Sequence, residues 1–484
     1  STTDIDTISY ENYTSSVTLN LGNTSEQVVS GSSDKDTVIN IENVIGGTVG
    51  DYITGSSASN KIETGSGADT IYASAGSDTI DGGSSSSDVD EMNYSATTKI
   101  VLTTTGNDYT VTKVSGEKDV LKNIEQVQGS VYKDTFTGGV NSDVFKGGAE
   151  ADTLSGAGGT DSLYGESGDD LFIATSATDG SDFIDGGSDT ATARGSDTID
   201  YSKIGTAATP LTTEGITVVL NDKNQTVVTI DGGDDDTIKD IENIIGTQNS
   251  DFITGDSAAN TFDGQAGDDT FTQLDGKTAG DKIDGGADVD TIDYSNLSSG
   301  IKVTLANDAS FVDVKLSNVN DHKIANIENI TGTDQKDTII GNDKDNIFVG
   351  NAEDDILEGG AGADTLDGGT GDDTLKGGAG DDKLIGGAGI DTADFSDAED
   401  DINVDLGSIS TAPVLINAQL GSDTFDSIEG VIGGKGNDTL KGTSDVNTLI
   451  GGEGNDTLLG MGAVDAVGTT VVEYDYINGE GGND

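Results

Sequence analysis

The chain has 484 residues, with 71 glycines, 89 acidic and 23 basic residues, and a formal charge of −66. Acidity throughout excludes nucleic-acid binding, which needs a basic surface, and argues against anionic membranes. The sequence has no cysteine and one histidine, which excludes disulfides, thiol chemistry and Cys/His zinc centres, and no apolar run is long enough to predict a transmembrane helix. Because such a chain repels itself, we expect a divalent cation to stabilise it.

Five similar blocks follow one another along the chain. Each opens with an aromatic marker: "DTISY" at Asp6, "EMNYS" at Glu91, "DTIDYS" at Asp197 and at Asp290, and "DTADFS" at Asp391. A stretch of alternating apolar residues follows, such as "ITVVL" from Ile216 or "IKVTL" from Ile301, and predicts half-buried β-strands. A marker with a recurrent glutamate comes next, at Glu42, Glu125, Glu242, Glu328 and Glu429.

A nine-residue pattern, G-G-x-G-x-D-x-U-x with U a large apolar residue, begins after each glutamate marker. In the fourth block its frames start at Gly332, Gly341, Gly350, Gly359, Gly368, Gly377 and Gly386. Helical periodicity is absent, so the pattern predicts an all-β solenoid. We expect five modules, 1–89, 90–196, 197–289, 290–390 and 391–484, with rolls from about 46, 129, 246, 332 and 433. The fifth module stops inside a repeat, so we expect the sequence to be an excerpt of a longer polypeptide.

Frames such as "GGAGADTLD" and "GGTGDDTLK" closely resemble the calcium-binding nonapeptide of the RTX (repeats-in-toxin) family. The resemblance implies a right-handed parallel β-roll, in which six residues form a turn, three form a strand and two nonapeptides complete a coil. The residue types agree with this. Glycine permits the positive φ that aims backbone carbonyls at an ion, and the sixth-position aspartate adds the hard oxygen that calcium prefers.

Turns on one side of such a roll lie eighteen residues apart, so an ion would be shared by aspartates two frames apart. In the fourth module and at the first residue of the fifth, this predicts ligation by Asp355, Asp364, Asp373, Asp382 and Asp391 and by the turn carbonyls of Gly359, Gly362, Gly368, Gly371, Gly377 and Gly380. The other predicted ligands are Asp51, Asp69, Asp78, Asp134, Asp143, Asp152, Asp161, Asp170, Asp251, Asp269, Asp438 and Asp456. Asn60, Asn260, Asn346 and Asn447 replace the aspartate, and there we expect weak calcium binding or none.

Three other features have two interpretations each. The marker glutamate either ligates an ion where a roll begins or is a solvated turn residue, and we favour the latter. The marker aromatic either is an exposed contact residue or caps a roll, which we favour. His322 lies in a variable stretch without a partner for acid–base or nucleophilic chemistry, so we expect no active site within these residues.

The resemblance implies a bacterial protein exported by type I secretion and folded by extracellular calcium. We expect a non-enzymatic structural protein of a surface layer (S-layer) or an extracellular filament, which self-associates and is anchored to cell-surface polysaccharide or lipopolysaccharide. The alternatives are the calcium-rigidified stalk of an RTX adhesin and the accessory roll of a secreted enzyme.

Overall fold

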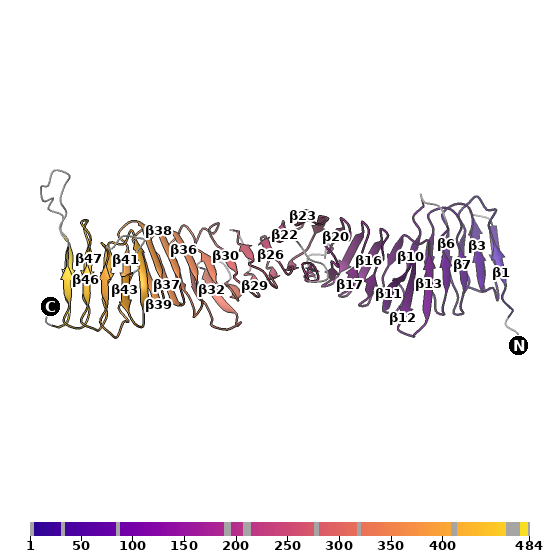
Figure 1. The fold of residues 1–484 in the computed structure, drawn as a ribbon. Coiled ribbons are helices and arrows are strands. Elements are labelled where there is room, and N and C mark those ends of the chain that lie inside the picture. The colour runs from indigo at the N-terminus through magenta and orange to yellow at the C-terminus, as the bar shows by residue number, and fades with distance from the viewer. Residues whose placement is uncertain are drawn as a thin grey trace. The chain divides into compact units, whose positions relative to one another are not determined.

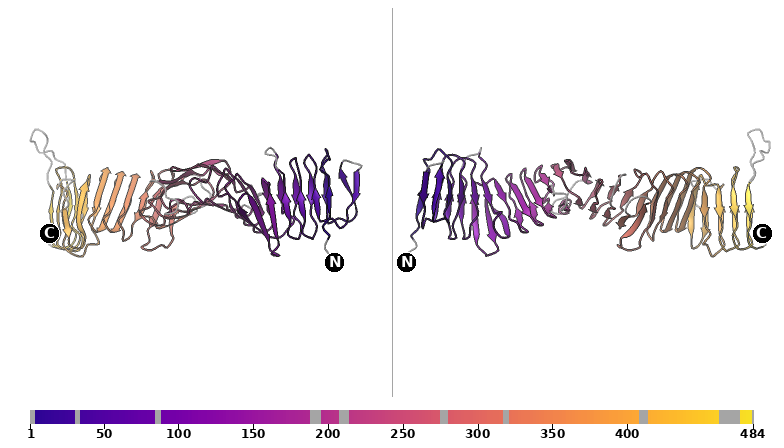
Figure 2. Two further views of the ribbon diagram at one scale, coloured as in Figure 1. Left: turned by 45° about the vertical axis from the view of Figure 1, so that its right-hand side comes forward. Right: turned by 180° about the vertical axis from the view of Figure 1, so that it is seen from behind.

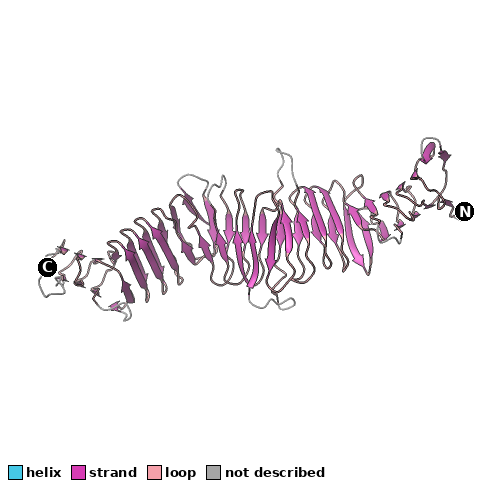
Figure 3. Cartoon of the chain, turned by 90° about the horizontal axis from the view of Figure 1, so that it is seen from above, coloured by secondary structure: helices cyan, strands magenta, loops and turns pink. Residues whose placement is uncertain are grey.

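The computed structural model describes residues 4–30, 34–83, 88–187, 195–206, 214–274, 280–316, 321–407, 414–460 and 475–482. The chain divides into two compact units, Ser1–Gln248 and Asn249–Asp484. The described residues of both units form short strands joined by turns, with no helix among them (Figure 3). Accordingly, no described segment is a helix long and apolar enough to cross a membrane. The all-β prediction is confirmed.

The first unit contains two stacks of parallel strands (Figure 1). One stack comprises β1 (Thr7–Ser9), β5 (Asn43–Ile45), β7 (Lys61–Glu63), β9 (Thr79–Asp81), β15 (Thr135–Thr137), β17 (Thr153–Ser155), β19 (Leu171–Ile173), β21 (Thr198–Asp200) and β25 (Asn243–Ile245). The other comprises β2 (Thr18–Asn20), β6 (Tyr52–Thr54), β8 (Thr70–Tyr72), β10 (Glu91–Asn93), β14 (Gln126–Gln128), β16 (Val144–Ala149), β18 (Ser162–Ser167) and β20 (Phe183–Asp185).

The second unit repeats this arrangement. One stack holds β27 (Thr261–Asp263), β29 (Lys282–Asp284), β35 (Thr338–Ile340), β37 (Ile356–Ala361), β39 (Thr374–Ala379), β41 (Thr392–Asp394), β45 (Gly430–Ile432), β47 (Thr448–Ile450) and β49 (Tyr476–Asn478). The other holds β26 (Ser250–Thr254), β28 (Thr270–Thr272), β30 (Thr291–Asp293), β34 (Asn329–Thr331), β36 (Ile347–Ala352), β38 (Thr365–Thr370) and β40 (Lys383–Ala388). A third group is β42 (Asn403–Asp405), β46 (Thr439–Lys441) and β48 (Thr457–Leu459).

Antiparallel excursions interrupt the stacks. They are β3 (Glu26–Ser30) with β4 (Asp34–Thr37); β11 (Ile100–Thr105), β12 (Asp108–Lys113) and β13 (Lys118–Lys122); β22 (Glu214–Val219), β23 (Thr226–Ile230) and β24 (Asp236–Lys239); β31 (Ile301–Thr304), β32 (Val312–Leu316) and β33 (His322–Ala325); and β43 (Val414–Asn417) with β44 (Gly421–Asp426). In the first unit β13 pairs in parallel with β9 and antiparallel with β12, and β11 then pairs in parallel with β15. An excursion therefore places a residue distant in sequence on the next coil.

The register of the parallel strands confirms that two nonapeptides form one coil. Ile347 pairs with Thr365, and Ile356 pairs with Thr374, an offset of eighteen residues in both cases. The eighth-position side chains of Leu366 and Leu375 are fully buried in the core. Strands of each unit consequently lie side by side with the turns along their edges (Figure 2). The five module boundaries stay a prediction.

Candidate metal centres

The sixth-position aspartates of successive coils form ladders of hydrogen bonds along the turns. In every pair predicted to share an ion, the backbone N–H of the earlier residue donates to Oδ1 of the later one. The donor–acceptor distances are 2.7–2.9 Å for Asp51–Asp69, Asp134–Asp152, Asp143–Asp161, Asp152–Asp170, Asp251–Asp269, Asp355–Asp373, Asp364–Asp382, Asp373–Asp391 and Asp438–Asp456. The structure thus brings these residues together, while their ligation of calcium stays a prediction.

The second carboxylate oxygen of many ladder residues is buried and has no hydrogen-bond partner. This holds for Oδ2 of Asp69, Asp152, Asp161, Asp269, Asp290, Asp355, Asp364, Asp373, Asp382, Asp391 and Asp423. A buried polar atom without a partner costs on the order of 1–3 kcal/mol. A row of such atoms on consecutive coils indicates sites for a positively charged ligand.

Glycine leaves open the space that these oxygens face. A Cβ added at Gly359 would overlap Oδ2 of Asp364 and lie 2.7 Å from the carbonyl oxygen of Gly377, one coil later. At the fourth position, Gly362 has φ +124°, and a Cβ there would lie 2.6 Å from the carbonyl oxygen of Lys344. The first and fourth positions of the turn therefore admit only glycine without a rearrangement. The same two positions of the following frames hold Gly368, Gly371, Gly377 and Gly380, whose carbonyl oxygens are predicted calcium ligands.

Burial disfavours the charged form of the ladder carboxylates. Burial, reinforced by the neighbouring carboxylates, raises the pKa of Asp355 to about 7 and of Asp152 to about 8. The same causes raise the pKa of Asp269 to about 9 and of Asp423 to about 8. A cation beside these groups would offset both the burial of their charge and the repulsion between neighbouring carboxylates, because it favours the ionised form.

The ligand atoms that the ladders offer fit calcium. Among the described residues, no three acidic or histidine side chains gather as a metal-ligand set. An ion in a ladder would therefore combine carboxylates of two coils with turn carbonyls, an all-oxygen set typical of calcium. When bound, the ion would neutralise the stacked carboxylates and hold neighbouring turns together.

The asparagine rungs satisfy themselves without a cation. Nδ2 of Asn60, Asn346 and Asn447 donates to the backbone carbonyl of the marker glutamates Glu42, Glu328 and Glu429, at 2.8, 2.8 and 3.2 Å. In Asn260 the amide donates to Oδ1 of Asp256 at 3.3 Å. The amide nitrogen thereby serves as the donor that these oxygens need, which supports the expectation that these rungs bind calcium weakly or not at all.

The marker glutamates accept hydrogen bonds within the ladders. Glu328 is buried, so the favoured interpretation as a solvated turn residue is wrong there, whereas the other four are half-buried and for them it stays a prediction. The Oε2 atoms of all five accept the backbone N–H of the residue one coil earlier at 2.9–3.0 Å, in Asp6–Glu42, Asp90–Glu125, Asp197–Glu242, Asp290–Glu328 and Asp391–Glu429. Each glutamate thus stands where the first coil of a new roll would otherwise have an aspartate. Whether it also ligates an ion stays a prediction.

The marker tyrosines are buried, and Tyr94 and Tyr201 close the second ladder of a roll, as favoured. The hydroxyl groups of Tyr10, Tyr94 and Tyr201 donate to Oδ2 of Asp36, Asp119 and Asp236 at 2.9, 2.8 and 3.0 Å. Each of these aspartates precedes its marker glutamate by six residues. That constant spacing was the signal that could have found them.

His322 occupies the corresponding place in the fourth module, at the start of β33, six residues before Glu328. The register that pairs Lys282 with Lys323 sets His322 beside Asp281, as Asp119 lies beside Asp78. Its side chain is buried. The residue therefore belongs to the end of a ladder and not to a variable surface loop.

Sequence reasoning also missed ladder residues whose spacing is not eighteen. Asp90, Asp182, Asp281 and Asp290 accept the N–H of a ladder residue 21 positions earlier, at 2.8–3.0 Å. Asp423 accepts the N–H of Asp382 at 3.1 Å across 41 positions. Insertions in the turns and the antiparallel excursions account for these longer separations.

Comparison with known proteins agrees with this geometry. Six stretches match the family described as the RTX calcium-binding nonapeptide repeat, residues 45–86, 127–172, 240–272, 331–366, 358–393 and 432–465. No curated protein sequence matches the chain. The solved structure of an extracellular lipase from Serratia marcescens aligns at 17% identity with a TM-score of 0.17, over 42% of this chain and only 39% of the lipase. That alignment carries no argument about function, whereas the matched stretches coincide with the ladders, so these stretches of the chain are RTX calcium-binding nonapeptide repeats.

Proposed function

We propose that the calcium-loaded rolls are a structural element of an extracellular layer or filament. The observation that carries the proposal is the continuity of the ladders: both units present buried carboxylates coil after coil. A scaffold of this kind repeats one surface along its length, and repeated surfaces favour repeated contacts between copies. RTX repeat proteins are typically secreted, which agrees with this role.

Calcium would act as the folding switch. Extracellular calcium modules bind in the ~10⁻⁴–10⁻³ M range. At a calcium concentration tenfold above Kd, each site stabilises the folded chain by about 1.4 kcal/mol through mass action. Ladder residues such as Asp364 and Asp373, together with the glycine turns, would hold the ions. The chain would therefore fold outside the cell and stay unfolded in calcium-poor cytosol.

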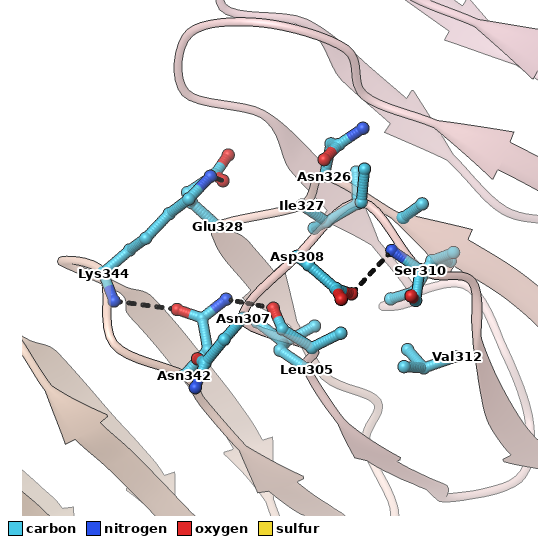
Figure 4. A pocket seen from close by; sticks show the side chains of 14 residues that line it. Leu305, Asn307, Asp308, Ser310, Val312, Asn326, Ile327, Glu328, Asn342 and Lys344 are labelled. Atoms are coloured by element: carbon cyan, nitrogen blue, oxygen red, sulfur yellow. Dashed lines mark hydrogen bonds and ion pairs between the residues drawn. The ribbon is translucent and has the colours of Figure 1, made fainter.

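A cavity in the second unit illustrates why we favour a structural role. It has a volume of about 150 Å³ and lies between an excursion and the fourth roll (Figure 4). Glu328, on one side, accepts the ammonium of Lys344 on Oε1 and the N–H of Asp290 on Oε2. Asp308, on the other side, accepts the N–H of Ser310 at 3.0 Å. Glu328 is thus engaged in a ladder and Asp308 in its own turn, which agrees with a structural role.

Electron microscopy and light scattering before and after addition of millimolar calcium test the proposal. Ordered sheets or filaments that form with calcium are the expected result. Monodisperse particles at every protein concentration would refute self-assembly and favour an adhesin stalk or the accessory roll of a secreted enzyme. Addition of purified lipopolysaccharide to the same samples tests the proposed surface anchor.

A further inference from the structure

One end of the first roll holds a buried lysine side chain between two adjacent coils. Lys113 is the last residue of β12, and its Nζ lies 2.6 Å from the carbonyl oxygen of Ser74 and 3.0 Å from that of Gly76. The same ammonium lies 2.9 Å from Oδ1 of Asp119 and 3.8 Å from Oδ2 of Asp78. The lysine side chain is only 5% exposed, and both carboxylates are buried. A charge so deeply buried needs partners on all sides, and Lys113 has them.

These partners are the groups that would otherwise surround an ion. Ser74 and Gly76 are the second and fourth residues of a nonapeptide turn, and Asp78 is its sixth. Asp119 is the ladder residue one coil later, because the N–H of Asp78 donates to its Oδ1 at 2.9 Å. Two turn carbonyls and two carboxylates of adjacent coils thus converge on one ammonium, which offers three hydrogen-bond donors and a positive charge.

The carboxylates of this rung are also fully satisfied. Oδ2 of Asp119 accepts the hydroxyl of Tyr94, and Oδ2 of Asp78 accepts the hydroxyl of Ser74 at 3.0 Å. Neither residue is among those with an unpartnered buried oxygen. This rung therefore has no buried carboxylate oxygen that lacks a partner and would need a bound cation.

The matching rung in the second unit lacks the lysine. Asp382 and Asp423 lie at the same kind of junction, yet Oδ2 of each is buried without a partner. Asn417 stands six residues before Asp423, as Lys113 does before Asp119, and Phe395 replaces the marker tyrosine. The two junctions therefore differ in whether the chain supplies its own positive charge.

We propose that the Lys113 ammonium is a resident cation that occupies the calcium position between Asp78 and Asp119. This rung takes no calcium, whereas the Asp382–Asp423 rung takes one. Asp78, predicted from the repeat as a calcium ligand, binds an ammonium under this assignment. In the folded chain, this end of the first roll therefore needs no calcium ion of its own.

Native mass spectrometry of the full calcium-loaded chain tests the assignment by counting bound ions. Lys113→Ala removes the ammonium and leaves space, so it should bind one calcium ion more than the unsubstituted chain. Lys118→Ala removes an equal charge from an exposed position of the same excursion and should leave the count unchanged. An unchanged count in Lys113→Ala would overturn the proposal.

Lys113→Met keeps most of the side-chain volume without its charge, and it tests the proposal if Lys113→Ala does not fold. With the carboxylates left unpaired and no room for an ion, it should need more calcium for half-maximal folding than the unsubstituted chain. Circular dichroism during calcium titration measures that midpoint. A midpoint equal to that of the unsubstituted chain would show that the ammonium is not the required cation.

Discussion

Asp373 should link two calcium ions to the stability of the fourth roll. Its Oδ1 accepts the N–H of Asp355 at 2.7 Å, its own N–H donates to Asp391 at 2.8 Å, and its Oδ2 is buried without a partner. Asp373→Ala removes a carboxylate from both shared sites. Because each saturating ion adds about 1.4 kcal/mol of stability per tenfold rise in calcium, the variant should lose roughly 2.7 kcal/mol of that dependence per decade.

Denaturant unfolding, followed by circular dichroism at several calcium concentrations, measures this slope directly. Asn346→Ala is the first control: it loses the hydrogen bond to the carbonyl of Glu328, worth about 1 kcal/mol at every calcium concentration, and keeps the slope. Asp372→Ala is the second, because it removes an equal charge from an exposed fifth position. If Asp373→Ala shows the slope of these controls, Asp373 ligates no calcium and the ladder assignment fails.

Three further predictions concern pH, the glycine at the first position of a turn, and the marker tyrosine that closes a ladder. The pKa of Asp355 and of Asp364 is raised to about 7, so the folded form binds extra protons when calcium is absent; in chelator, the folded fraction should fall as pH rises from about 4 to above 7, and circular dichroism at pH 5 to 8 checks this. Protons compete with calcium, so the calcium midpoint should rise at acid pH; a pH-independent midpoint would contradict this. Gly359→Ala sets a Cβ against Oδ2 of Asp364 and should raise the calcium midpoint, an effect absent if the turn relaxes freely. Tyr94→Phe leaves Oδ2 of Asp119 unpartnered and should cost about 1–3 kcal/mol in urea unfolding, whereas a loss below 0.5 kcal/mol would mean that water replaces the hydroxyl.

The repeating part of the fold follows from the sequence because it depends on local spacing. A coil of two nonapeptides places Asp355 above Asp373 wherever frames run on without interruption, and the structure has that register. The apolar eighth position, as at Leu366, defines the buried side of each strand. For these residues, period and residue type suffice.

The junctions could not be predicted in this way. Asp119 joins the ladder only because β13 pairs with β9, and this tertiary pairing spans a whole antiparallel excursion. The lysine that fills the same junction is separated from Ser74 by 39 residues, and no pattern in the repeat indicates their contact. Sequence periodicity describes a coil and its neighbour along the chain, whereas these contacts depend on which strand returns to the stack.

The one-way hydrogen bonds of the ladders give a roll two chemically different ends. Each amide donates to the carboxylate of the following coil, as Asp364 does to Asp382, so a ladder has a direction. Where the fourth roll begins, the backbone N–H of Ile301 fills Oδ1 of Asp337 at 2.7 Å, and where it ends, the N–H of Asp391 donates to the marker glutamate Glu429. Consecutive rolls within a unit therefore follow one another head to tail, and contacts of that kind do not close on themselves by symmetry.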